Sequence, residues 1–211
     1  MRKIDIEKLL QQLAEKRPVF HSEADFQHEL AWLLHSEFPK ANIRLEKPFL
    51  KENGKSEYVD IFADLNDKKY FIELKYKTKK LKSKEEINGE KFYLKDQGAQ
   101  DCGRYDFWKD VSKIESRVAE NNNGLGYAIF LTNDYSYLNS PREKSYSYNF
   151  RTTDKRDDCH GNLGRLGGYN QGREEGIILK NSYKLEWQYY GKCGFRFLLL
   201  EIKWLSISLK N

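Results

Sequence analysis

The chain has 211 residues, a length that fits one domain with a substantial buried core. Hydrophobic residues make up 39% of the sequence and charged residues 33%, a globular composition that argues against an intrinsically disordered chain. A membrane or secreted protein is not expected, because no apolar run approaches ~18 residues and no signal-peptide pattern opens the sequence. The net charge of +5 is compatible with a nucleic-acid partner without requiring one.

The first part of the chain carries helical and then strand patterns. Apolar residues at helical spacing predict an amphipathic helix over 3–16, which Pro18 ends. Ser22 is a good N-cap, and a second helix is predicted from there to about Phe38. Three strands in meander order are predicted next, near 43–50, 57–64 and 69–77.

The second helix carries two polar residues in or beside its apolar stripe. At 100° per residue, Glu23 and Gln27 fall in or next to the stripe, whereas Asp25 and His28 point elsewhere. Acidic residues are favoured in the first turn of a helix by its dipole, so Glu23 also has an ordinary explanation. The pattern nevertheless predicts that Glu23 faces the sheet, with Gln27 as its alternative in any site there.

A third helix and a buried strand follow. The helix is predicted over about 100–119, and its apolar side carries Phe107, Val111, Ile114 and Val118. Gln100 and Arg104 extend the same side toward the start of this helix. The nearly continuous apolar run over 126–132 is typical of a central strand covered on both faces.

The last third of the chain changes in character. Residues 151–176 alternate glycines with arginines, which predicts a long loop with little capacity to pack. The loop was open to two interpretations, a clamp for nucleic acid or a disordered insertion. Two strands, at about 183–190 and 195–207, are expected to form a half-exposed C-terminal β-hairpin.

Asp60, Glu73 and Lys75 lie on two predicted strands that a hairpin would bring together. Glu73 and Lys75 are two residues apart, so their side chains emerge on the same face of a strand. Charged groups inside an apolar strand need compensation from a partner, a metal or water. A salt-bridged set on an exposed sheet is one outcome. The other is a metal site, because paired carboxylates attract a hard divalent cation and a nearby ammonium can help to activate water.

These residues make the chain similar to the PD-(D/E)XK nuclease superfamily, which includes restriction endonucleases and Holliday-junction resolvases. The matching residues are Val59-Asp60, twelve intervening residues, and Glu73-Leu74-Lys75, with Val59 in place of the usual proline. The resemblance implies that Asp60 and Glu73 bind Mg²⁺, for which Mn²⁺ could substitute, together with the Leu74 carbonyl. It also implies that Lys75 orients or activates the attacking water. A helix-borne glutamate completes this site in many relatives, which makes Glu23 a further candidate ligand and catalytic residue.

The resemblance implies a fold as well. It predicts a single α/β nuclease-like domain over residues 1–211 with a restriction-endonuclease-like αβββαβ core at about 20–135. The central sheet would be mixed and flanked by helices, with the C-terminal β-hairpin appended. The order of predicted helices and strands agrees with this core.

Two further groups are candidate phosphate or nucleic-acid contacts. A lysine run follows the predicted metal site directly, where a phosphate backbone would pass, although such runs are usually solvated faces. The run contributes Lys77, Lys79, Lys80 and Lys82. Some relatives hold the scissile phosphate or the water with a glutamine or basic residue on the next helix, which makes Gln100 and Arg104 candidates. Burial is expected to lower the pKa of Lys75 itself.

The expected function is Mg²⁺-dependent hydrolysis of DNA phosphodiester bonds, by an endonuclease rather than an exonuclease. Three alternatives stay open: a catalytically silent nucleic-acid-binding module of the same fold, an RNA-cleaving nuclease, and a nuclease subunit of a phage-defence or toxin complex. A homodimer is compatible with the sequence. The expected location is the cytoplasm, because three widely spaced cysteines fit reduced thiols.

Overall fold

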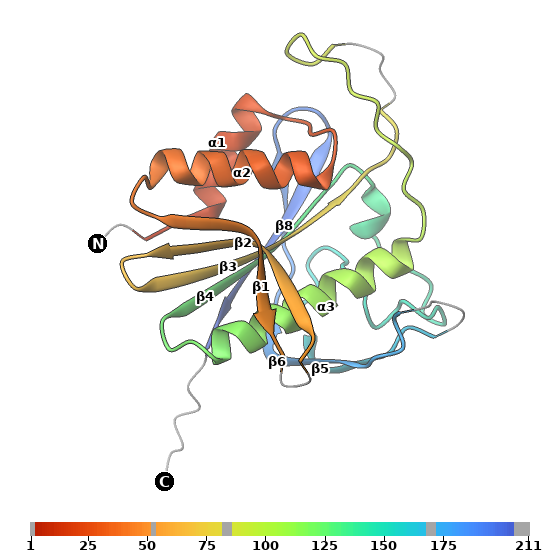
Figure 1. Cartoon of the computed structure of the whole chain (residues 1–211). Coiled ribbons are helices and arrows are strands. Elements are labelled where there is room, and N and C mark those ends of the chain that lie inside the picture. The colour runs from red at the N-terminus through yellow and green to blue at the C-terminus, as the bar shows by residue number, and fades with distance from the viewer. Residues whose placement is uncertain (1–2, 52–53, 82–85, 168–171, 205–211) are drawn as a thin grey trace.

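The structure is a computed structural model that describes residues 3–51, 54–81, 86–167 and 172–204. It is an α/β structure with a mixed six-stranded sheet, helices on both faces of that sheet and a separate two-stranded sheet (Figure 1). The strand order in the main sheet is β1-β2-β3-β4-β8-β7. The helical elements are α1 (Ile6–Lys16), α2 (Glu23–Glu37), α3 (Gln100–Ala119) and the 3₁₀ turn η1 (Tyr135–Tyr137). The strands are β1 (Asn42–Leu50), β2 (Ser56–Leu65), β3 (Lys68–Lys77), β4 (Gly124–Thr132), β5 (Cys159–Gly164), β6 (Ile177–Tyr183), β7 (Trp187–Tyr190) and β8 (Phe195–Lys203).

The two N-terminal helices form as their sequences predict, except that α1 begins at Ile6, three residues later than predicted. The Asp5 carboxylate caps α1 by accepting a hydrogen bond from the Lys8 N–H, and α1 ends two residues before Pro18. The Ser22 hydroxyl caps α2 in the same way, by accepting from the Asp25 N–H at 3.1 Å. This cap fixes the first turn of α2, and with it Glu23, over the main sheet.

The predicted central strand is confirmed. β4 pairs in parallel with β3 on one side and antiparallel with β8 on the other, and eight of its nine residues are buried. The parallel β3–β4 pair requires a crossover, which α3 provides. Gly126 in β4 lets α3 approach closely, because a Cβ at this position would lie 2.1 Å from the Ile114 side chain.

The molecule therefore has layers on both sides of the main sheet. α1 and α2 cover one face, and α3 covers the other, where the β5–β6 sheet packs against it (Figure 1). Two apolar clusters fill the spaces, one under α1 and α2 and one between the main sheet, α3 and the small sheet. Within the described part of the chain, no helix has both the length and the apolar character to cross a bilayer.

The C-terminal hairpin differs from its prediction in two ways. The strand predicted over 183–190 is interrupted, because β6 ends at Tyr183 and pairs with β5, and β7 begins only at Trp187. The hairpin of β7 and β8 is also not appended to the core. β8 pairs with β4 inside the main sheet, and its residues Leu198, Leu200 and Ile202 are buried on the α3 side.

The composition of the glycine- and arginine-rich segment 151–176 predicts a loop with little packing. For the described part of this segment that prediction is wrong. The segment contains β5, and Cys159, Leu163 and Leu166 are buried in the cluster beside α3. Three of its four arginines have acidic partners within the protein. Arg151 and Arg156 both pair with Asp158, and Arg173 forms two hydrogen bonds to Asp106 on α3. Sparse apolar residues and internal ion pairs hold the described part of this segment, 151–167 and 172–176, in place.

Candidate functional site

The candidate site lies where β2 and β3 separate. Their ladder pairs Ile61 with Ile72 and does not continue past this point. On the other side of β2, Glu46 has a positive φ of 49° and interrupts the β1–β2 pairing opposite Asp60. Side chains replace the ladder here. The Asp60 N–H donates to Glu73 Oε1 at 3.3 Å, and the Leu74 N–H donates to Asp60 Oδ2 at 2.6 Å.

α3 supplies an acidic and a basic residue to the same place. Lys75 Nζ lies 2.9 Å from Asp110 Oδ2, and Lys113 Nζ lies 2.7 Å from Glu73 Oε2. Lys113 also approaches Asp110 Oδ1 at 3.6 Å and donates to the Tyr58 carbonyl at 2.8 Å. Glu73 and Lys75 thus share one face of β3, as predicted, and both face α3.

α2 reaches the site from the opposite side. Glu23 Oε2 accepts a hydrogen bond from the Tyr76 N–H at 2.6 Å, and its charge acts on Asp60 and Lys75. Gln27 Nε2 donates to the Asp60 carbonyl at 2.8 Å and to Glu46 Oε1 at 2.7 Å. The prediction that Glu23 and Gln27 face the sheet is confirmed. Asp25 points elsewhere, as predicted, and pairs with Arg17.

The carboxylates of the site hold their protons more tightly than exposed ones. Burial raises the pKa of Asp60 to about 6; the Leu74 N–H bond opposes this rise and the negative charge of Asp110 adds to it. Burial, followed by repulsion from Asp110 and Asp60, raises the pKa of Glu73 well above its usual range despite the contact with Lys113. Only 3% of Glu73 is exposed. Gathering these charges therefore disfavours their ionisation.

The expected lowering of the Lys75 pKa is wrong. Burial does act in that direction, but the charges of Asp110 and Glu23 outweigh it, so the pKa of Lys75 is raised. The pKa of Lys113 is raised in the same way, because the attraction of Glu73 and Asp110 exceeds the effect of burial. Both lysines are consequently cationic at neutral pH and cannot act there as bases.

The donor set suits a hard divalent cation in its chemistry. Asp60 and Glu73 are carboxylates whose mutual repulsion a cation would relieve. The N–H and C=O of one strand residue point to the same edge, so the Leu74 carbonyl lies toward β2, where its N–H meets Asp60. In the described residues, no three histidine, cysteine or acidic side chains are grouped to hold a metal. The predicted set needs only two carboxylates and a carbonyl.

The predicted phosphate contacts are dispersed. Lys77, Lys79 and Lys80 lie at or just after the end of β3; the Lys79 ammonium lies 3.6 Å from Asp134, and Lys80 is exposed. Lys82 lies outside the described residues. Gln100 donates to Asp134 at 2.9 Å, and Arg104 binds the Ser136 and Asn139 carbonyls. The side chains of Gln100 and Arg104 are therefore directed to the turn after β4 and not to Asp60 and Glu73.

Asp110 and Lys113 were not identified from the sequence. A usable signal was present, because both residues flank the apolar stripe of Val111 and Ile114 on α3. The parallel β3–β4 pairing places this helix beside Glu73, and that pairing is not visible in a short motif.

The comparisons with known proteins give no relative. No family model matches the sequence, and no curated protein or solved structure matches the chain.

Proposed function

We propose that the chain is a Mg²⁺-dependent nuclease that hydrolyses DNA phosphodiester bonds as an endonuclease. The observation that carries the proposal is the convergence of Asp60, Glu73 and Lys75 with Asp110 and Lys113 where β2 and β3 separate. The raised pKa values of Asp60 and Glu73 add to it, because strongly perturbed groups cluster at functional sites.

The chain order around the site supports the proposed restriction-endonuclease-like core. The elements follow as α2, β1, β2, β3, α3 and β4, and α2 and α3 lie on opposite faces of the sheet. Glu23 from α2 reaches the same edge of β3 as Asp60. This is the arrangement expected if the helix-borne glutamate completes a metal site.

In the proposed mechanism, Asp60, Glu73 and the Leu74 carbonyl would hold the ion, with Glu23 beside them. When bound, Mg²⁺ supplies charge stabilisation at the phosphate and lowers the pKa of its water. Asp110 holds Lys75 in its cationic form, so Lys75 can orient the attacking water and offset negative charge on the phosphate oxygens. Lys113 pairs with Glu73 and so offsets part of the carboxylate charge.

A second candidate function is a nucleic-acid-binding module without catalysis. It is favoured by the fact that the charged groups of the site already have partners within the protein. Asp60 and Glu23 accept the N–H groups of Leu74 and Tyr76 along β3, and lysines pair with Glu73 and Asp110. On this interpretation the acids only continue the hydrogen bonding of β3 where β2 departs. Cleavage of RNA is a further alternative, because the same chemistry acts on both polymers.

A cleavage assay decides between these functions. Plasmid, linear DNA, single strands, a four-way junction and RNA are incubated with Mg²⁺, Mn²⁺ or EDTA, using the wild type, Asp60→Asn and Lys75→Ala. Asp64→Asn is the matched control, because Asp64 lies four residues further along β2. We expect metal-dependent cutting of DNA that Asp60→Asn and Lys75→Ala abolish and Asp64→Asn retains. Binding without cutting of any substrate would assign the chain to the binding-module alternative.

A further inference from the structure

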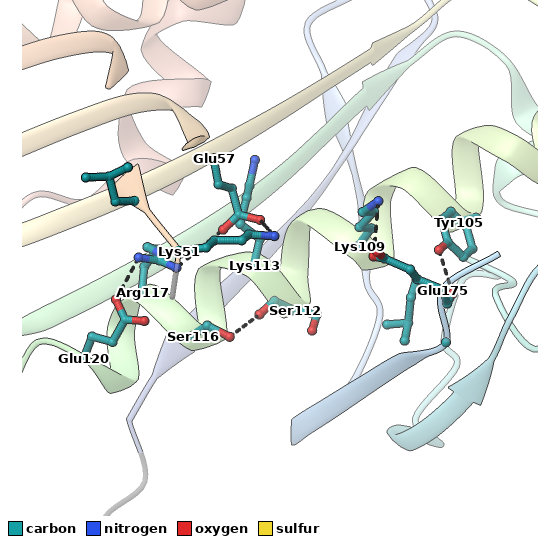
Figure 2. A pocket seen from close by; sticks show the side chains of 13 residues that line it. Lys51, Glu57, Tyr105, Lys109, Ser112, Lys113, Ser116, Arg117, Glu120 and Glu175 are labelled. Carbon is teal, nitrogen blue, oxygen red and sulfur yellow. Dashed lines mark hydrogen bonds and ion pairs between the residues drawn. The ribbon is translucent and has the colours of Figure 1, made fainter. Parts of the chain in front are cut away.

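A polar groove runs beside the candidate site along the outer side of α3. Its volume is about 580 Å³, and it lies between α3, the end of β1 and the start of β6. Lys109, Lys113 and Arg117 line it from α3, and Lys51 reaches it from the end of β1 (Figure 2). Lys113, which lines the groove, also contacts Glu73, so the groove lies next to the candidate site.

The spacing of these cations matches a linear polyanion. Lys109, Lys113 and Arg117 are four residues apart, which places them about 6 Å apart along the helix axis. One nucleic-acid strand carries a negative charge about every 3.4 Å of its axis. The row of three cations is about 12 Å long, which is the length of three or four successive phosphates.

The acidic partners in the groove leave binding capacity. Lys109 lies 3.7 Å from Glu175, whose side chain is 80% exposed, and exposed pairs of this kind contribute little. Lys51 and Arg117 share one carboxylate, Glu57, at 2.7 Å and 3.6 Å. Cations outnumber acids among the residues that line the groove.

Arg117 gives an independent indication of a ligand. It is 7% exposed, and its Nη1 pairs with Glu120 at 2.8 Å. Its Nε is buried, and no hydrogen-bond acceptor serves it within the part of the chain that is described. Buried donors without partners are rare in proteins, so the Arg117 guanidinium retains unused hydrogen-bonding capacity beside the groove.

We propose that this groove binds the phosphate backbone of one strand of the nucleic-acid substrate as it leaves the carboxylate site. The inference rests on the proposed function and deepens it, because it assigns a path to the substrate strand. Base identity plays no part in such contacts, so binding here is independent of sequence.

The test measures binding of labelled DNA oligonucleotides, single-stranded and duplex, by fluorescence anisotropy in EDTA over a series of NaCl concentrations. Lys51→Ala and Lys109→Ala remove exposed cations of the groove, and Lys155→Ala is the control, because Lys155 forms an exposed pair with Glu186 away from the groove. We expect each groove variant to bind about threefold to tenfold more weakly at 100 mM salt. The slope of log K against log salt should fall by about 0.7 for single strands and 0.9 for duplex per contact. Lys155→Ala should match the wild type.

Glu175→Gln tests the same groove by a gain. It frees Lys109 without removing a cation, so we expect tighter binding and a steeper salt slope. Unchanged affinity and slope in all three groove variants would overturn the inference, as would equal losses in Lys155→Ala. Equally tight binding of an acidic peptide of the same charge would assign the groove to a protein partner and overturn it too.

The two proposals fail in different ways. If the wild type cuts DNA and the groove variants bind DNA as tightly as the wild type, only the groove proposal is wrong. If the groove variants bind more weakly but the wild type cuts no substrate, only the nuclease proposal is wrong. A wild type that binds no nucleic acid at all contradicts both.

Discussion

The candidate site and the segment 151–176 are both rich in charge, yet they treat it in opposite ways. In the segment three of the four arginines pair with acids: Asp158 pairs with Arg151 and Arg156, and Asp106 pairs with Arg173. At the site, acids are gathered beside acids. Asp60 and Glu73 repel each other and Asp110, and two lysines do not relieve this fully.

The ion pairs of the segment stabilise the folded state, whereas the crowded carboxylates of the site destabilise it. Paired arginines satisfy buried carbonyls and anchor a segment that has few apolar residues. Crowded carboxylates instead resist ionisation, which lowers the stability of the folded state at neutral pH. Proteins retain such destabilising groups mainly where function needs them. On this ground we propose the site, and not the arginine-rich segment, as the functional part.

The largest expected effect is on catalysis. Lys75→Ala should lower the cleavage rate by about 10²–10⁴-fold, because the group that orients water and offsets phosphate charge is lost. Rates are measured under single-turnover conditions with Mg²⁺. Lys155→Ala serves as the control for loss of a lysine. A rate for Lys75→Ala within twofold of the wild-type rate would contradict the proposed role of the site in cleavage.

Arg156→Ala tests the structural side. Arg156 is 8% exposed and donates to the Asn149 and Arg151 carbonyls, which its removal leaves unsatisfied. We expect the free energy of unfolding to fall by about 2–4 kcal/mol, with unchanged cleavage per folded molecule. Urea unfolding measures the loss. Arg165→Ala is the matched control, because Arg165 lies in the same segment but is exposed. A specific loss of cleavage in folded Arg156→Ala would give this segment a functional role.

Asp110→Asn tests whether α3 positions Lys75. The expected loss in cleavage is about 10–100-fold, the range typical of residues that support a ligand or catalytic group. Asp110 helps to raise the pKa of Lys75, so the variant should lose activity at a lower alkaline pH than the wild type. The pH–rate profile above pH 8 shows this. A uniform loss with no shift in the alkaline limb would reduce Asp110 to a purely structural role.

The smallest expected effect is a gain in stability. Asp60 has a folded-state pKa raised from 3.8 to about 6, so its ionisation destabilises the fold progressively as pH rises from about 4 to 6 and fully above that. Asp60→Asn removes this penalty while its side-chain oxygen can still accept from the Leu74 N–H. At about 1.4 kcal/mol per pH unit the upper limit is about 3 kcal/mol, and partial exposure reduces it to about 1–2 kcal/mol. Urea unfolding in EDTA at pH 7.5 and pH 4 measures this gain in stability. An equal gain at both pH values would show that ionisation of Asp60 is not its cause.

Much of the fold follows from local sequence signals. Ser22 marks the start of α2, Pro18 follows the end of α1, and the apolar run of β4 identifies the central strand. What could not be predicted depends on contacts distant in sequence. β8 joins the main sheet only because β4 offers it a free edge, and β5 forms only by pairing with β6.

The site divides in the same way. Asp60, Glu73 and Lys75 stand out as charged residues in apolar strand patterns that resemble a nuclease motif. Periodicity places Glu73 and Lys75 on one face of their strand and turns Glu23 toward the sheet. Asp110 and Lys113 flank the apolar stripe of α3, but their contact with Lys75 and Glu73 depends on the packing of α3 against β3, which the local pattern does not specify. Gln100 and Arg104 share the side of α3 that faces the sheet, but nearby carbonyls and Asp134 at the turn after β4 take up their hydrogen bonds.

Metal binding tests most directly whether the crowded carboxylates form a cation site. Calorimetric titration of Mn²⁺ into the wild type and Asp60→Asn requires no substrate and no cleavage. We expect the wild type to bind one or two ions with release of protons near pH 6, where Asp60 titrates, and to gain about 2.7 kcal/mol of stability at a hundredfold excess over Kd. Asp60→Asn should lose this binding, while Asp64→Asn should keep it. No heat of binding in the wild type, or equal binding in Asp60→Asn, would contradict the account.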